Sequence, residues 1–154
     1  VDMDDDTIFE LSLHDNIIGV KDATNDLTRP IKFKKYITHK KFYQLSGEDA
    51  TQLAYLAHGG DGVISVTANI APKLVSSMQD EWFKENYKEA MTINEKLSNI
   101  NNLLFVESNP CPVKYAAHLL GICEYEIRLP LIKINQENEK KIREEIKSLS
   151  LSFT

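Results

Sequence analysis

The spacing of three short apolar runs in the first half of the chain constrains its fold more than any other feature. The runs lie at residues 16–21, 42–45 and 62–66, and segments of helical length separate them at residues 26–38 and 49–58. The first run is almost continuously apolar, as in a strand covered on both faces. We therefore predict a β-α-β-α-β order with short connections, which forms a parallel sheet with right-handed crossovers.

Proline and glycine residues agree with this order of elements. Pro30 lies early in the first amphipathic segment, where a proline fits the first turn of a helix. Gly59 and Gly60 follow the second segment and are suited to ending a helix. The stretch 59–62 is glycine-rich like a phosphate-binding loop, but such a loop follows a strand and precedes a helix. Because the order here is reversed, we interpret residues 59–62 as a helix end and a turn.

The second half of the chain has almost no strand pattern. From Pro72 onward, apolar residues recur at helical spacing. We predict a polar break at Asn99 to Asn102, a helix that starts at residues 109–112 and stops near Gly121, and a charged helix at Glu137 to Ser148.

Composition excludes several classes of protein. Hydrophobic residues make up 42% and charged residues 27% of the chain, as in ordinary globular proteins. The net charge of -5 argues against a nucleic-acid partner. No apolar run approaches the roughly 18 residues of a membrane span, and the acidic start is unlike a signal peptide, so we expect a cytoplasmic protein. Cys111 and Cys123 form no CxxC pair, and the histidines lack metal-ligand spacing.

Lys21 is the strongest candidate for a catalytic residue. It ends an apolar run and precedes a polar turn at residues 22–25. In parallel α/β folds, functional groups gather at the carboxyl ends of strands. A partly desolvated lysine there loses its proton more readily, and the neutral amine can attack a carbonyl carbon. The alternative is a lysine that extends into solvent or pairs with Asp22.

Four segments, taken together, resemble the dihydrodipicolinate synthase family (4-hydroxy-tetrahydrodipicolinate synthases). IIGVKDAT at residues 17–24 is similar to the strand that carries the Schiff-base lysine of that family. GGDGVISVTAN at residues 59–69 resembles its eighth barrel strand. LFVESNPCPVK at residues 104–114 and RLPL at residues 128–131 resemble its C-terminal helical signatures. The segments occur in the family's order and span nearly the whole chain.

The resemblance implies a fold. A complete (β/α)8 barrel takes about 250 residues. The 154-residue chain would therefore supply the carboxyl-terminal portion of such a barrel, its last three strands, followed by a C-terminal helical unit. We expect residues 1–84 to form the partial barrel with the Schiff-base lysine strand and residues 85–154 to form the helical extension.

The resemblance also implies an activity, that of a class I aldolase-type lyase. Lys21 would form an imine with pyruvate, and the derived enamine would attack L-aspartate 4-semialdehyde to give 4-hydroxy-tetrahydrodipicolinate, in lysine and diaminopimelate biosynthesis. Ile64 would place its backbone near the bound pyruvate. No metal or organic cofactor is implied, and the expected partners are copies of the chain in a homo-oligomer or a complementing amino-terminal half.

Two other interpretations are open. The chain resembles, less closely, related pyruvate-dependent aldolases such as N-acetylneuraminate lyase and keto-deoxy-sugar aldolases. It could also be a non-catalytic truncated remnant, because the family's other catalytic side chains belong to a part of the barrel that this sequence does not match. The expectation is that the chain needs that part for activity.

Overall fold

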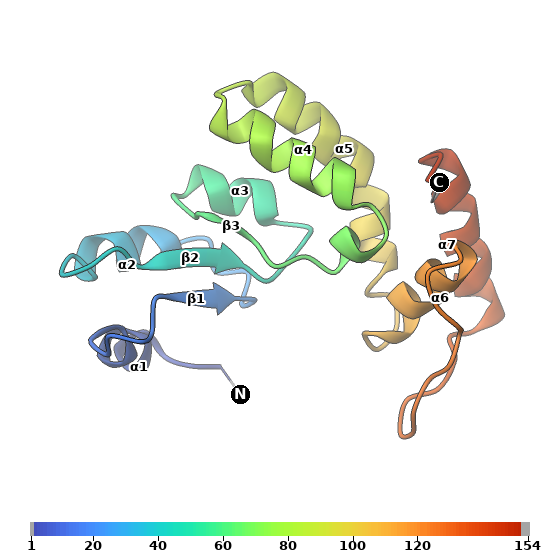
Figure 1. Ribbon diagram of the computed structural model, residues 1–154, viewed down its shortest axis with the longest axis horizontal. Coiled ribbons are helices and arrows are strands. Elements are labelled where there is room, and N and C mark those ends of the chain that lie inside the picture. The colour runs from blue at the N-terminus through green and yellow to red at the C-terminus, as the bar shows by residue number, and fades with distance from the viewer. Residues whose placement is uncertain (1, 152–154) are drawn as a thin grey trace. The chain divides into compact units, whose positions relative to one another are not determined.

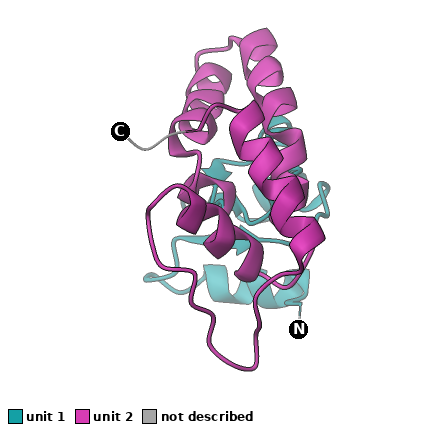
Figure 2. Cartoon of the chain, turned by 90° about the vertical axis from the view of Figure 1, so that its right-hand side faces the viewer, with its two compact units in different colours: residues 1–65 teal, residues 66–154 magenta. Residues whose placement is uncertain are grey.

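The structure is a computed structural model that describes residues 2–151. The chain forms two compact units, one from residues up to 65 and one from residue 66 onward (Figure 2). The boundary between these compact units lies before residue 84, the position of the sequence-based division into barrel and extension. The reason is that the helix at residues 72–83 packs against the helix that follows it.

The first unit alternates helices with short parallel strands (Figure 1). Its elements are α1 (Asp5–Ser12), β1 (Gly19–Asp22), α2 (Arg29–Tyr36), β2 (Tyr43–Ser46), α3 (Gln52–Ala57) and β3 (Gly62–Val63). The strands pair in parallel in the order β1-β2-β3, with Lys21 opposite Leu45 and Ser46 opposite Val63. The predicted β-α-β-α-β order is confirmed, although the third strand is shorter than the apolar run at residues 62–66.

Helices α1 and α2 form the small core of this unit. Ile8, Phe33 and Ile37 are buried together, with Val20 and Phe42 packed against them. Helix α2 carries Pro30 in its first turn, and α3 ends before Gly59, whose φ of +97° suits glycine. Both helix boundaries therefore agree with the proline and glycine positions in the sequence.

The second unit is helical. It contains a 3₁₀ turn, η1 (Thr67–Asn69), and the helices α4 (Pro72–Phe83), α5 (Tyr87–Leu103), α6 (Cys111–Leu119) and α7 (Gln136–Ser148). Helix α5 packs against α4 and α7, and α6 packs against α7. Fully buried side chains at helical spacing form the core, including Met78, Leu97, Ile100 and Ile142. No helix in the described part of the chain is long and apolar enough to cross a membrane.

The break predicted at Asn99 to Asn102 is wrong, because α5 continues to Leu103. Ile100 and Asn101 are buried in the helical unit rather than exposed in a loop. The side-chain oxygen of Asn101 accepts a hydrogen bond of 2.7 Å from the Thr67 hydroxyl. A polar run that looks like a linker is thus helical, since one of its asparagines has a buried partner far away in the sequence.

Helix α1 was not predicted, although its start carries a recognisable signal. Asp4 caps the helix by accepting a hydrogen bond of 2.7 Å from the Thr7 backbone N–H. Asp5 and Asp6 then add negative charge to the first turn, which favours a helix amino terminus. The acidic start of the chain therefore has a structural role.

Candidate active site

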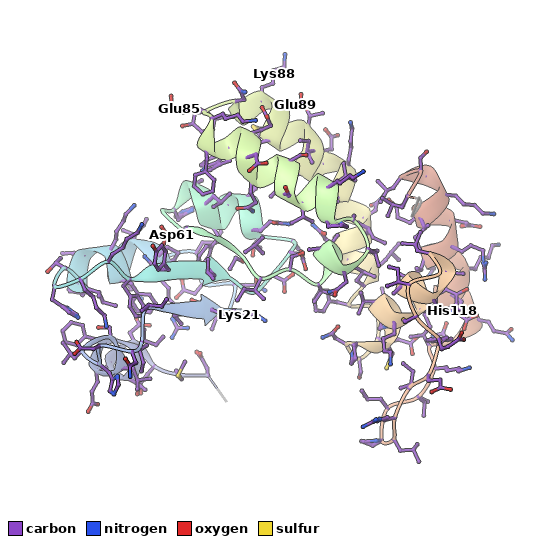
Figure 3. All side chains as sticks on the ribbon, viewed as in Figure 1. Lys21, Asp61, Glu85, Lys88, Glu89 and His118 are labelled. Atoms are coloured by element: carbon purple, nitrogen blue, oxygen red, sulfur yellow. The ribbon has the colours of Figure 1, made fainter. Side chains whose placement is uncertain are left out.

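The carboxyl ends of the three strands lie together at one end of the sheet, and both residues predicted for the site lie there. Lys21 is the third residue of β1, and Ile64 directly follows β3. Backbone hydrogen bonds connect the three ends through β2: Gly47 N–H donates to Asp22 O at 2.6 Å, and Ile64 N–H donates to Ser46 O at 2.8 Å. Figure 3 shows Lys21 at the end of β1.

The Lys21 side chain is exposed, and it passes over Gly47. A Cβ atom added at Gly47 would lie 2.8 Å from Lys21 Cε and 2.8 Å from Ala23 Cβ. The absence of a side chain at Gly47 therefore leaves room for the lysine. The partial burial expected for this amine is therefore not found within residues 2–151.

Of the two alternatives for Lys21, the exposed side chain agrees with a lysine that extends into solvent, whereas a pair with Asp22 is not found within residues 2–151. Successive side chains of a strand point to opposite faces, and Asp22 is buried whereas Lys21 is exposed. Asp22 Oδ1 lies 3.5 Å from Arg29 Nη1 and accepts hydrogen bonds from the Thr24 N–H at 2.9 Å and the Thr24 hydroxyl at 2.7 Å. The turn after the lysine is thus organised by a buried carboxylate.

Arg29 is a buried cation at the start of α2. Its Nε donates to Asp5 Oδ1 at 2.9 Å, its Nη1 donates to Asp2 Oδ1 at 3.3 Å, and its Nη2 donates to the Met3 carbonyl. Burial alone would lower the pKa of Arg29, but the hydrogen bond to Asp5 and the negative charges of Asp22, Asp2 and Asp5 outweigh it and raise that pKa. The guanidinium is therefore a permanent charge that connects three segments of the first unit.

A cavity of about 530 Å³ lies beside this edge strand, within the first unit. Its lining comes from the end of β1 and the turn after it, from Arg29 and from the amino-terminal segment: Asp2, Met3, Ile8, Val20, Lys21, Asp22, Ala23, Thr24 and Arg29. Of the charged groups in this lining, the Lys21 amine is exposed, whereas the Arg29 guanidinium and the Asp22 carboxylate are buried against each other.

Ile64 contributes its backbone to the carboxyl end of the sheet. Its side chain is 47% exposed, so it is not a core residue. Next to it, the Ser65 hydroxyl donates a hydrogen bond to Asp49, a fully buried carboxylate. Within residues 2–151, no group of three or more His, Cys, Asp or Glu side chains could hold a metal ion.

The sequence did not single out Asp22, Arg29 or Gly47 as parts of the site. Arg29 and Asp22 meet only in the tertiary structure, and the sequence around Arg29 indicates a helix start and no more. For Asp22 a signal existed, because an aspartate directly after the end of an apolar run, with Thr24 two residues on, is typical of a side-chain-capped turn.

Comparison with known proteins decides the family. The model of the dihydrodipicolinate synthetase family matches residues 1–149. The chain belongs to this family. It is 44% identical over 151 residues to 4-hydroxy-tetrahydrodipicolinate synthase of Gluconacetobacter diazotrophicus, an alignment that covers 98% of the chain and 51% of that relative. The chain thus spans about half the length of the curated relatives it matches.

Solved structures of family members have the same fold. The crystal structure of dihydrodipicolinate synthase from Aquifex aeolicus matches with a TM-score of 0.90 at 37% identity, over 97% of this chain and 51% of that chain. The chloride-inhibited enzyme from Acinetobacter baumannii, complexed with pyruvate, matches with a TM-score of 0.87 at 38% identity, over 95% and 50%. The predicted fold is therefore confirmed: the chain is the carboxyl-terminal portion of a (β/α)8 barrel, its last three strands, followed by C-terminal helices.

Proposed function

We propose that this chain supplies the Schiff-base lysine of a 4-hydroxy-tetrahydrodipicolinate synthase. The observation that carries the proposal is the position of Lys21, at the carboxyl end of a parallel strand and beside a cavity of about 530 Å³. Membership of the dihydrodipicolinate synthetase family supports it. So does the relative from Acinetobacter baumannii, which was crystallised with pyruvate.

In the proposed reaction, Lys21 Nζ attacks the ketone carbon of pyruvate, and the ketone oxygen leaves as water to give an imine. The cationic imine withdraws electrons, so the methyl group loses a proton and an enamine forms. The enamine carbon then bonds to the aldehyde carbon of L-aspartate 4-semialdehyde, and cyclisation releases Lys21. The protonated imine serves as the electron sink, so the step requires no metal or organic cofactor.

The surroundings of Lys21 suit this role in two ways. Gly47, directly after β2, leaves space for the lysine side chain. Ile64, at the same edge of the sheet, would present its backbone to the bound pyruvate. We further propose that residues 1–84 act as the barrel part and residues 85–154 as the extension, and that the active form is completed by an amino-terminal half and assembles as a homo-oligomer.

The test is reductive trapping of the imine. The chain is mixed with the amino-terminal half of the Gluconacetobacter relative, treated with pyruvate and borohydride, and mapped by peptide mass spectrometry. We expect one labelled lysine, Lys21. Lys21→Arg should abolish the label, because a guanidinium stays charged and forms no imine. Lys34→Arg, on the exposed surface of α2, is the matched control and should be labelled like the parent.

Three results would contradict the proposal. A label on another lysine would remove Lys21 from the reaction. If the folded assembly gives no label, the chain is a non-catalytic remnant. If the label maps to Lys21 but turnover occurs with a sugar-derived aldehyde and not with L-aspartate 4-semialdehyde, the activity is that of an N-acetylneuraminate lyase or a keto-deoxy-sugar aldolase.

A further inference from the structure

The residue after Lys21 is a buried carboxylate with an unusual set of partners. Asp22 is 5% exposed, and its Oδ1 has both Thr24 donors and Arg29 around it. Its Oδ2 is buried and has no hydrogen-bond partner within residues 2–151. A buried carboxylate needs hydrogen-bond donors and a neighbouring opposite charge, and Thr24 and Arg29 supply these to Oδ1 alone.

The partner of Asp22 is itself held in place from several directions. Arg29 contacts Asp5, Asp2 and the Met3 carbonyl, and its guanidinium carbon lies 5.8 Å from the centre of the Phe33 ring. A guanidinium with this many contacts has little freedom to move. It therefore provides a rigid point to which the end of β1 is attached.

The backbone of Asp22 is fixed as well. Its carbonyl accepts the 2.6 Å hydrogen bond from Gly47 N–H, and the Lys21 side chain lies beside the same glycine. Residue 22 is thus attached to α2 through its side chain and to β2 through its backbone. Lys21 immediately precedes it, so these two attachments determine the direction in which the lysine leaves the strand.

We propose that Asp22, anchored by Arg29, is a positioning residue that aims the Lys21 amine at the carbonyl carbon of a bound oxo acid. The inference rests on the proposed function of Lys21. Asp22 lines the same cavity as Lys21, but its carboxylate is buried against Arg29 and Thr24, so the proposed role is exerted through the backbone of residue 22 and not by contact with the substrate. Correct placement of a reacting group matters greatly, since a displacement of about 1 Å can lower a rate about 100-fold.

The chain contains a matched control four residues further on. Asp26 Oδ1 accepts hydrogen bonds from the Thr28 N–H at 2.9 Å and the Thr28 hydroxyl at 2.6 Å, which repeats the Asp22–Thr24 arrangement. Asp26 is exposed and has no ion pair with Arg29 among the described residues. Asp22→Asn and Asp26→Asn therefore make the same chemical change in the same local turn, and only the first removes the buried charge next to Lys21.

The experiment measures the rate of imine trapping against pyruvate concentration, using the assembly described above. For Asp22→Asn we expect a maximal rate about 10- to 100-fold lower. The pyruvate concentration at half-saturation and the shape of the pH profile should stay as in the parent, because Asp22 does not contact pyruvate. Asp26→Asn should match the parent in all three measurements.

Every other result of this experiment would overturn either the positioning role of Asp22 or the proposed function of Lys21. If the parent is labelled at Lys21 and Asp22→Asn is trapped at the parental rate, the positioning role is overturned while the proposed function stands. A changed half-saturation or a lost limb of the pH profile would overturn it in favour of direct substrate contact. If the folded parent is not labelled, both proposals fail together. Should Asp22→Asn not fold, Thr24→Val, which removes the hydroxyl that donates to Asp22 and accepts from the Asp26 N–H, must slow trapping, and a parental rate would overturn the inference.

Discussion

At the scale of single residues, Gly47 and Lys21 share one small space at the carboxyl edge of the sheet. A Cβ atom at residue 47 would lie 2.8 Å from the Lys21 Cε and 2.8 Å from the Ala23 Cβ, which is too close to both. The end of the Lys21 side chain is flexible, whereas the Ala23 Cβ belongs to a turn that is fixed by the hydrogen bonds between Asp22 and Thr24. A side chain at position 47 would therefore displace the lysine rather than the turn.

This packing predicts the effect of Gly47→Ala. Imine trapping at Lys21 should fall by about tenfold or more, because the amine is pushed from its position while the strand stays paired. The measurement is the trapping rate, with circular dichroism to verify folding. Gly121→Ala is the comparison: a Cβ there would meet nothing within 4 Å, but the φ of +73° makes alanine unfavourable, so this variant should lose some stability in the helical unit while trapping stays unchanged. Trapping of Gly47→Ala at the parental rate would contradict this account.

At the scale of elements, the capping residues of two helices decide where each helix starts. Asp4 caps α1 and Asn135 caps α7, and each accepts a hydrogen bond from the backbone N–H three residues ahead. Helix α1 depends on an ionised cap, whereas α7 depends on a neutral one. The two helices should therefore respond differently to pH and to substitution.

Acidification should loosen the start of α1. Hydrogen bonds from the Thr7 side chain and backbone hold the pKa of Asp4 below its ordinary value of 3.8. A lowered pKa means that the cap stabilises the folded state above the pKa of the unfolded chain, and that this contribution is lost as the pH falls through the folded pKa. The amide shift of Thr7, followed by NMR, should report the transition. Asp4→Asn keeps a cap acceptor without a charge, so the same transition in that variant would contradict the assignment.

Loss of the α7 cap should destabilise the helical unit. Asn135→Ala leaves the Asn138 N–H without its acceptor and should lower the free energy of unfolding by about 1 kcal/mol. Urea denaturation of the chain measures the change. Lys140→Ala, at an exposed position of the same helix, is the comparison and should change the stability by less than about 0.5 kcal/mol. Equal losses in both variants would show that the cap contributes nothing of its own.

At the scale of the whole molecule, the described sheet has an open edge at β1, since that strand pairs only with β2 within residues 2–151. An unpaired edge offers backbone N–H and carbonyl groups to another strand. The proposed catalytic amine lies on this strand, so pairing of the edge would fix the backbone that carries Lys21.

We expect the 154-residue chain by itself to show little synthase activity. Without the acid–base groups that the rest of the barrel would supply, turnover should be about 100- to 10,000-fold lower than in the complemented assembly. A coupled assay with pyruvate and L-aspartate 4-semialdehyde, with and without the amino-terminal half, makes the comparison. Full turnover by the chain alone would show that these groups are not needed.

The order of elements could be predicted from local patterns. The apolar runs predicted a parallel sheet, Pro30 and Gly59 marked helix ends, and the spacing from Pro72 onward predicted helices. Lys21 could be placed at the end of its strand for the same reason. These features depend on residues close together in the chain, so periodicity and turn chemistry are sufficient to find them.

What only the tertiary structure decided depends on residues far apart in the sequence. Asn101 continues α5 through the predicted break because Thr67 meets it, and Arg29 reaches both the amino-terminal segment and Asp22. Gly47 matters because the Lys21 side chain crosses it. A buried polar group is stable only with a partner, and a partner tens of residues away leaves no periodic trace in the sequence.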